Sequence, residues 1–282
     1  MVCGISGWVD GGEAATGSVK YLIRKLKARR FAKIPSDKFH VFQVPGQLSL
    51  RPHVKIENGL LKEHHFPENP FYYWINPDGD HDLILFLGTE PSLNWEGYAS
   101  AILDLAQEFG TVRICNLGGV LDKTPYRKEP GVSSICSSPE LKEEMLRYGV
   151  HFTSYEGPGS FGTMLFHLGQ SRHMQIVSIT ARATYYPEYN IIIPYNPKAV
   201  RAIVKRLSRM FHITLDTSDL DKSSDEFESK LEFMASHNPE FRNYIDELEK
   251  DFIEDRYEEP LDISADEAVR IAEELLRGEK ED

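Results

Sequence analysis

The sequence has few cysteines and lacks a long apolar run. It contains 3 cysteines in 282 residues, Cys3, Cys115 and Cys136, with no Cys-x-x-Cys spacing. Isolated thiols argue against a disulfide framework and a cysteine zinc site, so we interpret them as buried small hydrophobic residues. No apolar run approaches the roughly 20 residues that cross a bilayer, and the opening MVCGISGW lacks the pattern of a signal peptide. We therefore expect a soluble, cytoplasmic protein with no membrane partner.

Positive charge is scarce toward the C-terminus. Residues 216–282 carry 24 Asp and Glu against 8 Lys and Arg, a net charge of −16; the remaining 20 acidic and 24 basic residues give the preceding segment +4. A nucleic-acid partner needs a dense basic surface that neutralises phosphates, so we expect none. The acidic segment either packs against basic patches of its own body or of another subunit, or it forms a well-solvated helical surface.

Several catalytic motifs are also absent. Pro158 stands where a Gly-x-Ser-x-Gly elbow around Ser160 would need its first glycine, and no Gly-x-x-x-x-Gly-Lys-Ser/Thr loop occurs. The histidines are scattered without the spacing of a metal site. The sequence therefore predicts no metal and no cofactor.

Up to about residue 211 the chain alternates short apolar runs with segments of helical periodicity, which predicts an α/β fold with a mostly parallel sheet. The candidate strands are 3–9, 39–44, 81–87, 112–117, 151–155 and 175–181. Three further strand-like stretches lie at 54–57, 60–66 and 72–75, and Asn58-Gly59 predicts a hairpin turn between the first two. Helices are predicted by apolar stripes within 15–26, 95–109 and 200–211.

The chain changes character after residue 215. The polar stretch DTSDLDKSSDE, residues 216–226, predicts a linker, and helices are predicted at 226–234, 239–251 and 265–277. We therefore divide the chain into an α/β domain, 1–215, and an acidic helical C-terminal subdomain, 216–282.

The stretch YEGPGSFG spells Gly157-x-Gly159-x-x-Gly162 between a predicted strand and a predicted helix. A dinucleotide fingerprint also needs an acidic residue at the end of the following strand, and QIVSITA instead runs into Arg182. Pro158 removes one amide that would cradle phosphate. We interpret the stretch as a tight structural turn at the mouth of a groove.

Ligands of parallel α/β sheets bind at the carboxyl ends of the strands. The turns expected at this edge supply carboxylates, bare backbone and a guanidinium. The candidate groove residues are Asp10, Gly11, Glu90, Gly118, Gly119, Arg127, Glu156, Gly157, Gly159 and Arg182. Arg127 either binds an anion or forms a structural salt bridge, and an ordinary set of small and polar turn residues explains the others equally well. The aromatic run at Tyr185, Tyr186 and Tyr189 predicts an interface.

Five stretches in order resemble the family of proteasome assembly chaperone 2 and its prokaryotic relatives. They are GWVDGGEAATGSVKYLIRKL, LILFLGTEPSLNWEGYASAILDLAQEFG, NLGGVLDKTPYRKEPGVSS, YEGPGSFGTML and SITARATYYPEY. The match as a whole runs from about Ile5 to Met210. The family often has His-Thr-Arg where this chain has Pro125-Tyr126-Arg127, so any role of that histidine is lost here.

The resemblance implies a three-layer α/β/α fold of the nucleoside phosphorylase and peptidyl-tRNA hydrolase type. It implies a homo-oligomer, a trimer or tetramer, and chaperone-like binding of proteasome subunits in some relatives. Other relatives carry labels such as ATP-grasp or carboxylate-amine ligase, and no catalytic residue carries over. Two hypotheses follow: a protein-binding assembly factor, or an enzyme acting on a small anionic or nucleoside-like metabolite in the groove, with Arg127 or Arg182 holding the anion and Asp10 or Glu90 as acid or base.

Overall fold

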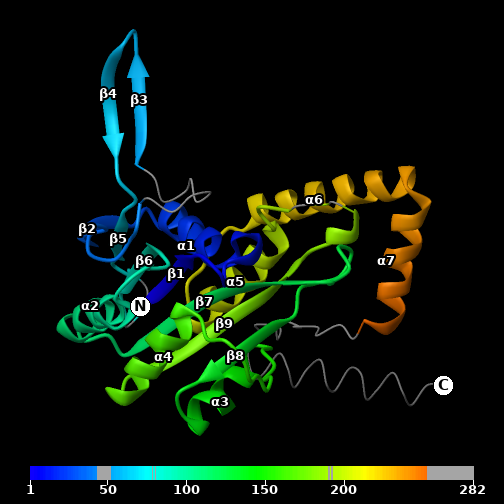
Figure 1. The fold of residues 1–282 in the computed structure, drawn as a ribbon. Helices are drawn as coiled ribbons and strands as arrows, with labels where there is room; N and C mark the ends of the chain where they lie inside the picture. Colours follow the sequence, from blue (N-terminus) through cyan, green and yellow to red (C-terminus); the bar gives the residue numbers. More distant parts are fainter. Residues whose placement is uncertain (43–51, 78, 80, 190, 192, 253–282) are drawn as a thin grey trace.

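A mixed sheet of seven strands forms the centre of the computed structural model, which describes residues 1–42, 52–77, 79, 81–189, 191 and 193–252 (Figure 1). The strand order is β2-β5-β6-β1-β7-β9-β8. The four strands β6, β1, β7 and β9 are parallel neighbours, whereas β5 and β8 run antiparallel to the strands beside them. The bounds are β1 Val2–Ser6, β2 Arg29–Ile34, β5 Asn69–Trp74, β6 Leu83–Thr89, β7 Arg113–Asp122, β8 Val132–Cys136 and β9 Gln175–Thr184.

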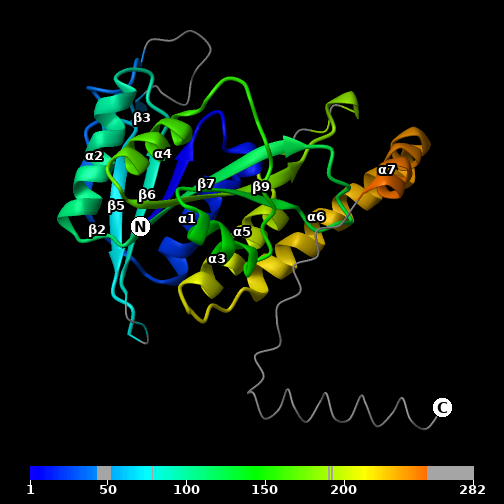
Figure 2. The ribbon, with the colours of Figure 1, turned by 90° about the horizontal axis from the view of Figure 1, so that it is seen from below.

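Helices cover both faces of this sheet (Figure 2). Side chains alternate along each strand, so Val2 and Leu85 join the apolar cluster under one set of helices, and Cys3 and Phe86 join the cluster under the other. The first set is α1 Ala14–Lys25, α3 Pro139–Leu146 and α5 Pro197–Met210, and the second is α2 Trp95–Glu108 and α4 Phe161–Ser171. None of the described helices is long and apolar enough to cross a membrane.

Side-chain caps fix where several helices begin. The Asn196 side chain accepts a hydrogen bond from the Ala199 amide at 3.1 Å, and Pro197 occupies the first helical turn of α5. Asn238 accepts from the Phe241 amide at 3.1 Å at the start of α7 Pro239–Asp251. The bounds of α7 confirm the helix predicted there.

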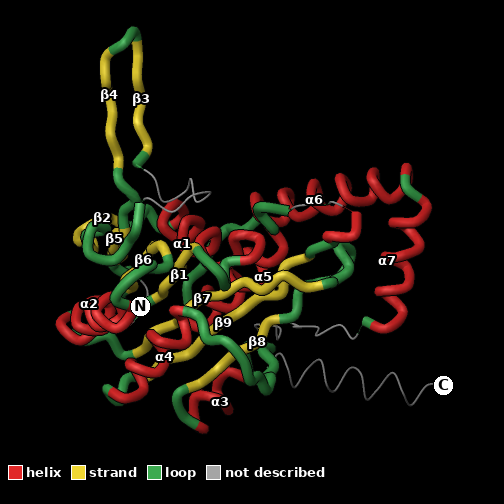
Figure 3. The backbone as a smooth tube through the Cα atoms, in the orientation of Figure 1, coloured by secondary structure: helices red, strands yellow, loops and turns green. Residues whose placement is uncertain are grey.

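Two appendages extend from opposite ends of the molecule (Figures 1 and 3). One is a hairpin of β3 His53–Glu57 and β4 Leu60–His65, which forms a separate two-stranded sheet. The predicted turn at Asn58-Gly59 is confirmed, because both residues have positive φ between these strands. The other is α6 Ser218–His237 followed by α7.

Several sequence-based expectations were wrong. Residues 39–42 form turn and loop rather than a strand, and residues 43–44 lie outside the described part. The segment 151–155 makes only an isolated bridge, between His151 and Ser133. The predicted linker is helical from Ser218 onward, as the first half of α6. Cys3 and Cys115 are buried as expected, Cys136 is half-buried, and the helix predicted at 265–277 lies outside the described residues.

Candidate functional site

Two predicted groove carboxylates do lie at the carboxyl ends of neighbouring strands, but both hold the fold together. Asp10 follows β1 and accepts hydrogen bonds from the backbone amides of Ala15 and Thr16 at 2.9 and 3.0 Å and from the Thr16 hydroxyl at 2.6 Å. It therefore caps α1. Burial raises the pKa of Asp10, against hydrogen bonds from Thr16 and Ala15 that lower it.

Glu90 follows β6 and joins two loops. Its carboxylate accepts a hydrogen bond from the Trp8 amide at 2.8 Å and another from the Phe161 amide at 3.1 Å. Phe161 is the first residue of α4, so Glu90 provides a negative charge at the N-terminus of that helix. A phosphate bound at this helix terminus would have to compete with the protein's own carboxylate.

Gly118 and Gly119 lie inside β7 and not in a turn after it, because this strand continues to Asp122. The Gly119 amide donates to the Val9 carbonyl at 3.0 Å, and a Cβ at Gly119 would lie 2.3 Å from the Gly11 carbonyl oxygen. The glycines let the β1–α1 loop pack directly on β7. Their role here is close backbone packing.

Arg182 also lies inside a strand, near the end of β9. Its guanidinium is 3.1 Å from the Asp122 carboxylate and 3.4 Å from Nε2 of His151. Glu156, Gly157 and Gly159 lie on an exposed loop before α4, where the Tyr155 hydroxyl donates to the Pro158 carbonyl at 3.1 Å. At this edge, Asp10 anchors the start of α1 and Glu90 anchors the loops at Trp8 and Phe161. Gly119 packs against Gly11, and Glu156 is exposed to solvent.

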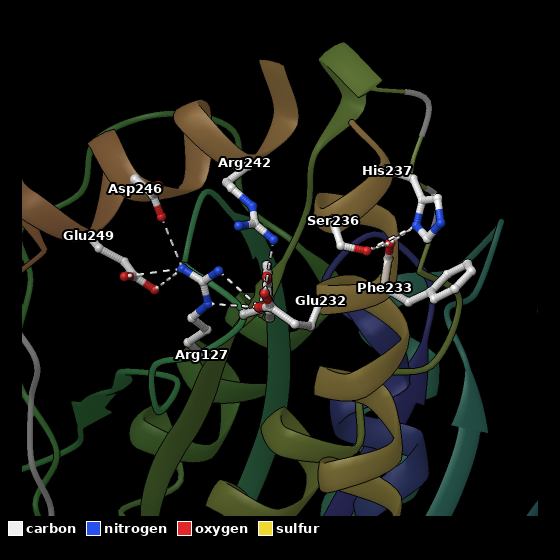
Figure 4. Close-up of polar contacts among 9 residues, drawn as sticks. Arg127, Glu232, Phe233, Ser236, His237, Arg242, Asp246 and Glu249 are labelled. Atoms are coloured by element: carbon white, nitrogen blue, oxygen red, sulfur yellow. Dashed lines mark hydrogen bonds and ion pairs between the residues drawn. The ribbon is translucent and has the colours of Figure 1, made fainter. Parts of the chain in front are cut away.

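Arg127 does not belong to this edge. It points toward the acidic helices, where it contacts three carboxylates (Figure 4). One terminal nitrogen lies 2.9 Å from Glu232 on α6, and the other lies 3.1 Å from Asp246 and 3.5 Å from Glu249 on α7. Of the two roles predicted for Arg127, the structure shows the salt bridge.

A second basic anchor lies beside the first. Lys198, near the start of α5, is almost fully buried; its ammonium donates to the Tyr126 carbonyl at 2.8 Å and to the Glu228 carboxylate on α6. The Tyr126 hydroxyl donates to Glu232 at 2.6 Å. Part of the acidic segment therefore packs against basic groups of its own body, which was one of the alternatives predicted from the charge distribution.

Aromatic side chains complete this contact. Tyr186 is fully buried, its hydroxyl donates to the Thr124 carbonyl at 2.8 Å, and its ring packs edge-on against Phe241 of α7 with centroids 5.4 Å apart. Tyr189 packs against Phe241 and Tyr244, with centroids 5.0 and 5.3 Å apart. The predicted aromatic interface thus includes a contact within the chain, and Tyr186 is not available to another molecule. Tyr185 is half-buried.

The ion pairs change the acid-base behaviour of their members. Hydrogen bonds from Tyr126 and then from Arg127 lower the pKa of Glu232. Burial and the neighbouring Glu232 carboxylate raise the pKa of the Tyr126 hydroxyl. Both groups keep their ordinary charge states near neutral pH, which suits a contact that is held permanently.

Outside this anchored contact, α6 presents exposed apolar side chains. Phe233 is 65% exposed and Met234 42% exposed, although they lie on an acidic helix. A shallow hollow of about 660 Å³ lies next to Phe233 and is lined by Tyr126, Arg127, Glu228, Ser229, Glu232 and Ser236. This surface was not predicted from the sequence, where its only signal is the pair Phe233-Met234 in an acidic segment.

The side chains predicted as acid, base or anion clamp already have partners within the chain. Asp10 and Glu90 accept hydrogen bonds from backbone amides, and Arg127 pairs with carboxylates. Among the described residues, no three His, Cys, Asp or Glu side chains are grouped so that they could hold a metal ion.

The fold and this surface define an α/β protein in which a mixed seven-stranded sheet carries an acidic pair of helices. The chain belongs to the PAC2 family, whose sequence model matches residues 4–235. No curated protein sequence matches it at a significant level.

Solved structures show the same fold. A PAC2 family protein from Streptomyces avermitilis is 27% identical, with a TM-score of 0.74 over 84% of this chain and 95% of that one. A proteasome-assembly chaperone homologue from Mycobacterium tuberculosis is 22% identical, with a TM-score of 0.76 over 86% and 98%. An archaeal proteasome activator from Pyrococcus furiosus is 25% identical, with a TM-score of 0.62 over 83% and 91%.

Proposed function

We propose that this protein is a homo-oligomeric assembly factor that binds a protein partner through the surface of α6 around Phe233. The observation that carries the proposal is an exposed aromatic side chain beside a shallow hollow, on a helix that Arg127 and Lys198 fix to the body through Glu232 and Glu228. Exposed aromatic residues on a rigid element are typical anchors of protein interfaces.

The chemistry of the surface indicates the kind of partner. Residues 216–252 carry 12 Asp and Glu against 4 Lys and Arg. A pair of helices with net negative charge that carries an exposed apolar anchor favours a basic partner surface with an apolar pocket, because complementary charge speeds association and fixes orientation. The names of relatives point to proteasome subunits, since one is a proteasome-assembly chaperone homologue and another a proteasome activator. The likeness of the three-layer fold to nucleoside phosphorylases stays a prediction. The number of subunits, a trimer or tetramer, also stays a prediction.

Binding to proteasome subunits of the source organism tests the proposal. We expect the wild-type protein to bind in a titration followed by interferometry, and we expect Phe233→Ser to weaken binding by about tenfold or more, which corresponds to roughly 1.4 kcal/mol. Leu93→Ser is the matched control, because Leu93 is 51% exposed but lies in the loop before α2. Equal weakening by both variants, or no binding by the wild type, would contradict the proposal.

The enzyme hypothesis is tested separately by thermal shift against nucleotides, nucleosides and phosphate. A ligand at 100 times its dissociation constant adds about 2.7 kcal/mol of stability. A hit that is lost in Arg182→Ala would favour the groove, whereas we expect no shift because the groove carboxylates are already engaged.

A further inference from the structure

The β3–β4 hairpin, which we call the arm, has one apolar and one charged face. Residues paired across an antiparallel ladder share a face, so the pairs Val54–His64 and Ile56–Leu61 lie on one face. The other face carries Lys55, whose ammonium is 2.9 Å from Glu57 and 3.7 Å from Glu63, and His65, 3.1 Å from Glu63. The ion pairs confirm this division, since they link only residues of the second face.

The apolar face of the arm is open to solvent. Every residue from His53 to Phe66 is exposed, and Ile56 and Leu61 are 64% and 62% exposed. The arm points away from the body (Figure 1). A two-stranded ribbon alone in water is marginally stable at best, and three or more strands or a packed face are needed for independent stability. The exposed apolar face of the arm is therefore suited to being covered by another molecule.

A hollow of matching apolar character lies at the other end of strands β2 and β5, away from the root of the arm. It has a volume of about 950 Å³, and its lining includes Phe31, Tyr73, Ile75, Phe109 and Val112. Three of these, Ile75, Phe109 and Val112, are more than half exposed. Arg113 also lines the hollow, but its guanidinium is paired with the Glu144 carboxylate at 2.6 and 2.8 Å.

The arm cannot reach the hollow of its own chain. The ladder between β2 and β5 runs from the pair Ile34–Asn69 to the pair Arg29–Tyr73. The arm continues from the first end, and Tyr73 of the hollow lies at the second, four residues along β5 from Asn69 and so roughly 14 Å away at about 3.4 Å per residue. Since the arm extends outward from its root, only the hollow of another copy is accessible to it.

Charge does not oppose a contact between the two surfaces. In the hollow, the Arg113 guanidinium is neutralised by Glu144, and the Asp82 carboxylate accepts a hydrogen bond from the Asn76 amide at 2.9 Å. On the arm, Lys55 is neutralised by Glu57 and Glu63 on the charged face, away from Ile56 and Leu61. The two apolar surfaces can therefore meet without bringing unpaired charges of the same sign together.

We propose that the arm of one copy docks its apolar face, around Ile56 and Leu61, into the hollow around Phe109 and Val112 of a second copy. This inference rests on the proposed homo-oligomer and specifies how the copies meet. The contact joins different surfaces, so it is head-to-tail and closes into a ring if the rotation between copies allows. One arm face offers on the order of 200–300 Å², below the roughly 800 Å² per partner of a stable interface. Each copy gives and receives an arm and so makes two such contacts. Because each contact is small, the assembly should depend on protein concentration.

Two adjacent leucines allow a matched test. Leu61 lies on the apolar face and Leu60, opposite Glu57, on the charged face, and they are 62% and 60% exposed. Mass is measured by light scattering after size exclusion at several concentrations. We expect oligomers for the wild type and Leu60→Glu, and monomers for Leu61→Glu and for Val112→Glu. These sites are exposed, so circular dichroism and thermal unfolding should stay as in the wild type.

Mixing the two disrupted variants tests the head-to-tail geometry. Leu61→Glu keeps an intact hollow and Val112→Glu an intact arm, so an equimolar mixture should form a dimer through one functional contact. No dimer on mixing, or equal masses for Leu61→Glu and Leu60→Glu, overturns the arm proposal but leaves the homo-oligomer standing. A wild type that is monomeric at every concentration overturns both.

Discussion

The arm and the α6–α7 unit are both appendages of the same sheet, but only the second has most of its apolar side chains covered within the chain. Phe241 and Ile245 of α7 are buried against the body, whereas Ile56 and Leu61 of the arm face solvent. The ion pairs differ in the same way. Arg127 connects the body to α6 and α7, while Lys55 connects two parts of the arm to each other.

The difference shows that an amphipathic element packs stably on the rest of its own chain when its charged and apolar side chains both find partners there. The α6–α7 unit has long-range partners for both its charges and its aromatic rings, so packing and ion pairing act on the same contact. The arm satisfies only its own backbone and its own charges. Its exposed apolar face is the one that we propose a second copy covers.

We expect the largest effect from a substitution in the buried contact between α7 and the body. We expect Phe241→Ala to lower the free energy of unfolding of the α6–α7 contact by about 3–5 kcal/mol, because it empties a fully buried aromatic site. Phe233→Ala, on the same unit but exposed, should change it by less than about 0.5 kcal/mol. Urea unfolding followed by tyrosine fluorescence and circular dichroism measures both, and similar costs for the two variants would contradict the comparison.

Removal of the buried cation should rank second. Lys198→Met removes the donor to the Tyr126 carbonyl and the ion pair with the partly exposed Glu228, and we expect a loss of about 1–3 kcal/mol, as for leaving a buried acceptor without its hydrogen bond. Lys230→Met on the exposed side of α6 is the control and should cost less than about 0.5 kcal/mol. Chemical unfolding at neutral pH compares them; if Lys198→Met were as stable as its control, the anchor would have no energetic role.

Acid should loosen the anchored contact. The pKa of Glu232 is lower in the folded protein, so its stabilising contribution is present above the unfolded value of about 4.3 and is lost as the pH falls through the folded pKa. Unfolding measured from neutral pH into this acid range should show the loss in the wild type and a flatter dependence in Glu232→Gln. Parallel curves for the two proteins would show that Glu232 does not carry the effect.

The smallest effect is expected from deleting the open appendage. Replacing residues 53–65 with a short Gly-Ser link should change the stability of the monomeric body by less than about 0.5 kcal/mol, because all these residues are exposed. Thermal unfolding in dilute solution provides the measurement. A loss of several kcal/mol would mean that the arm supports its own body, contrary to the comparison.

Local patterns in the sequence predicted much of the fold. The apolar stripes predicted α1, α2 and α5, Asn238 and Pro239 marked the start of α7, and Asn58-Gly59 marked the arm. The edge strands β2 and β8 were not predicted, because RRFAKI and VSSIC mix polar residues that an edge strand exposes to solvent.

The candidate site was less accessible to sequence reasoning, for physical reasons. The contacts of Arg127 join residues more than 100 positions apart, and local periodicity has no information about such pairs. Gly118 and Gly119 suggested a turn, but they permit a close approach of loop and strand inside β7. The charge difference between the two parts of the chain indicated attraction without identifying which side chains provide it.

Hydrogen exchange at low and high protein concentration tests most directly whether one appendage is covered within the chain and the other between chains. Amide protection in α7 should be the same at both concentrations, since its partners belong to the same molecule. Protection in β3 and β4 should rise with concentration as arms dock into neighbouring copies. Amide protection in the arm that does not depend on concentration would contradict docking between copies. Protection in α7 that does depend on concentration would contradict a contact within the chain.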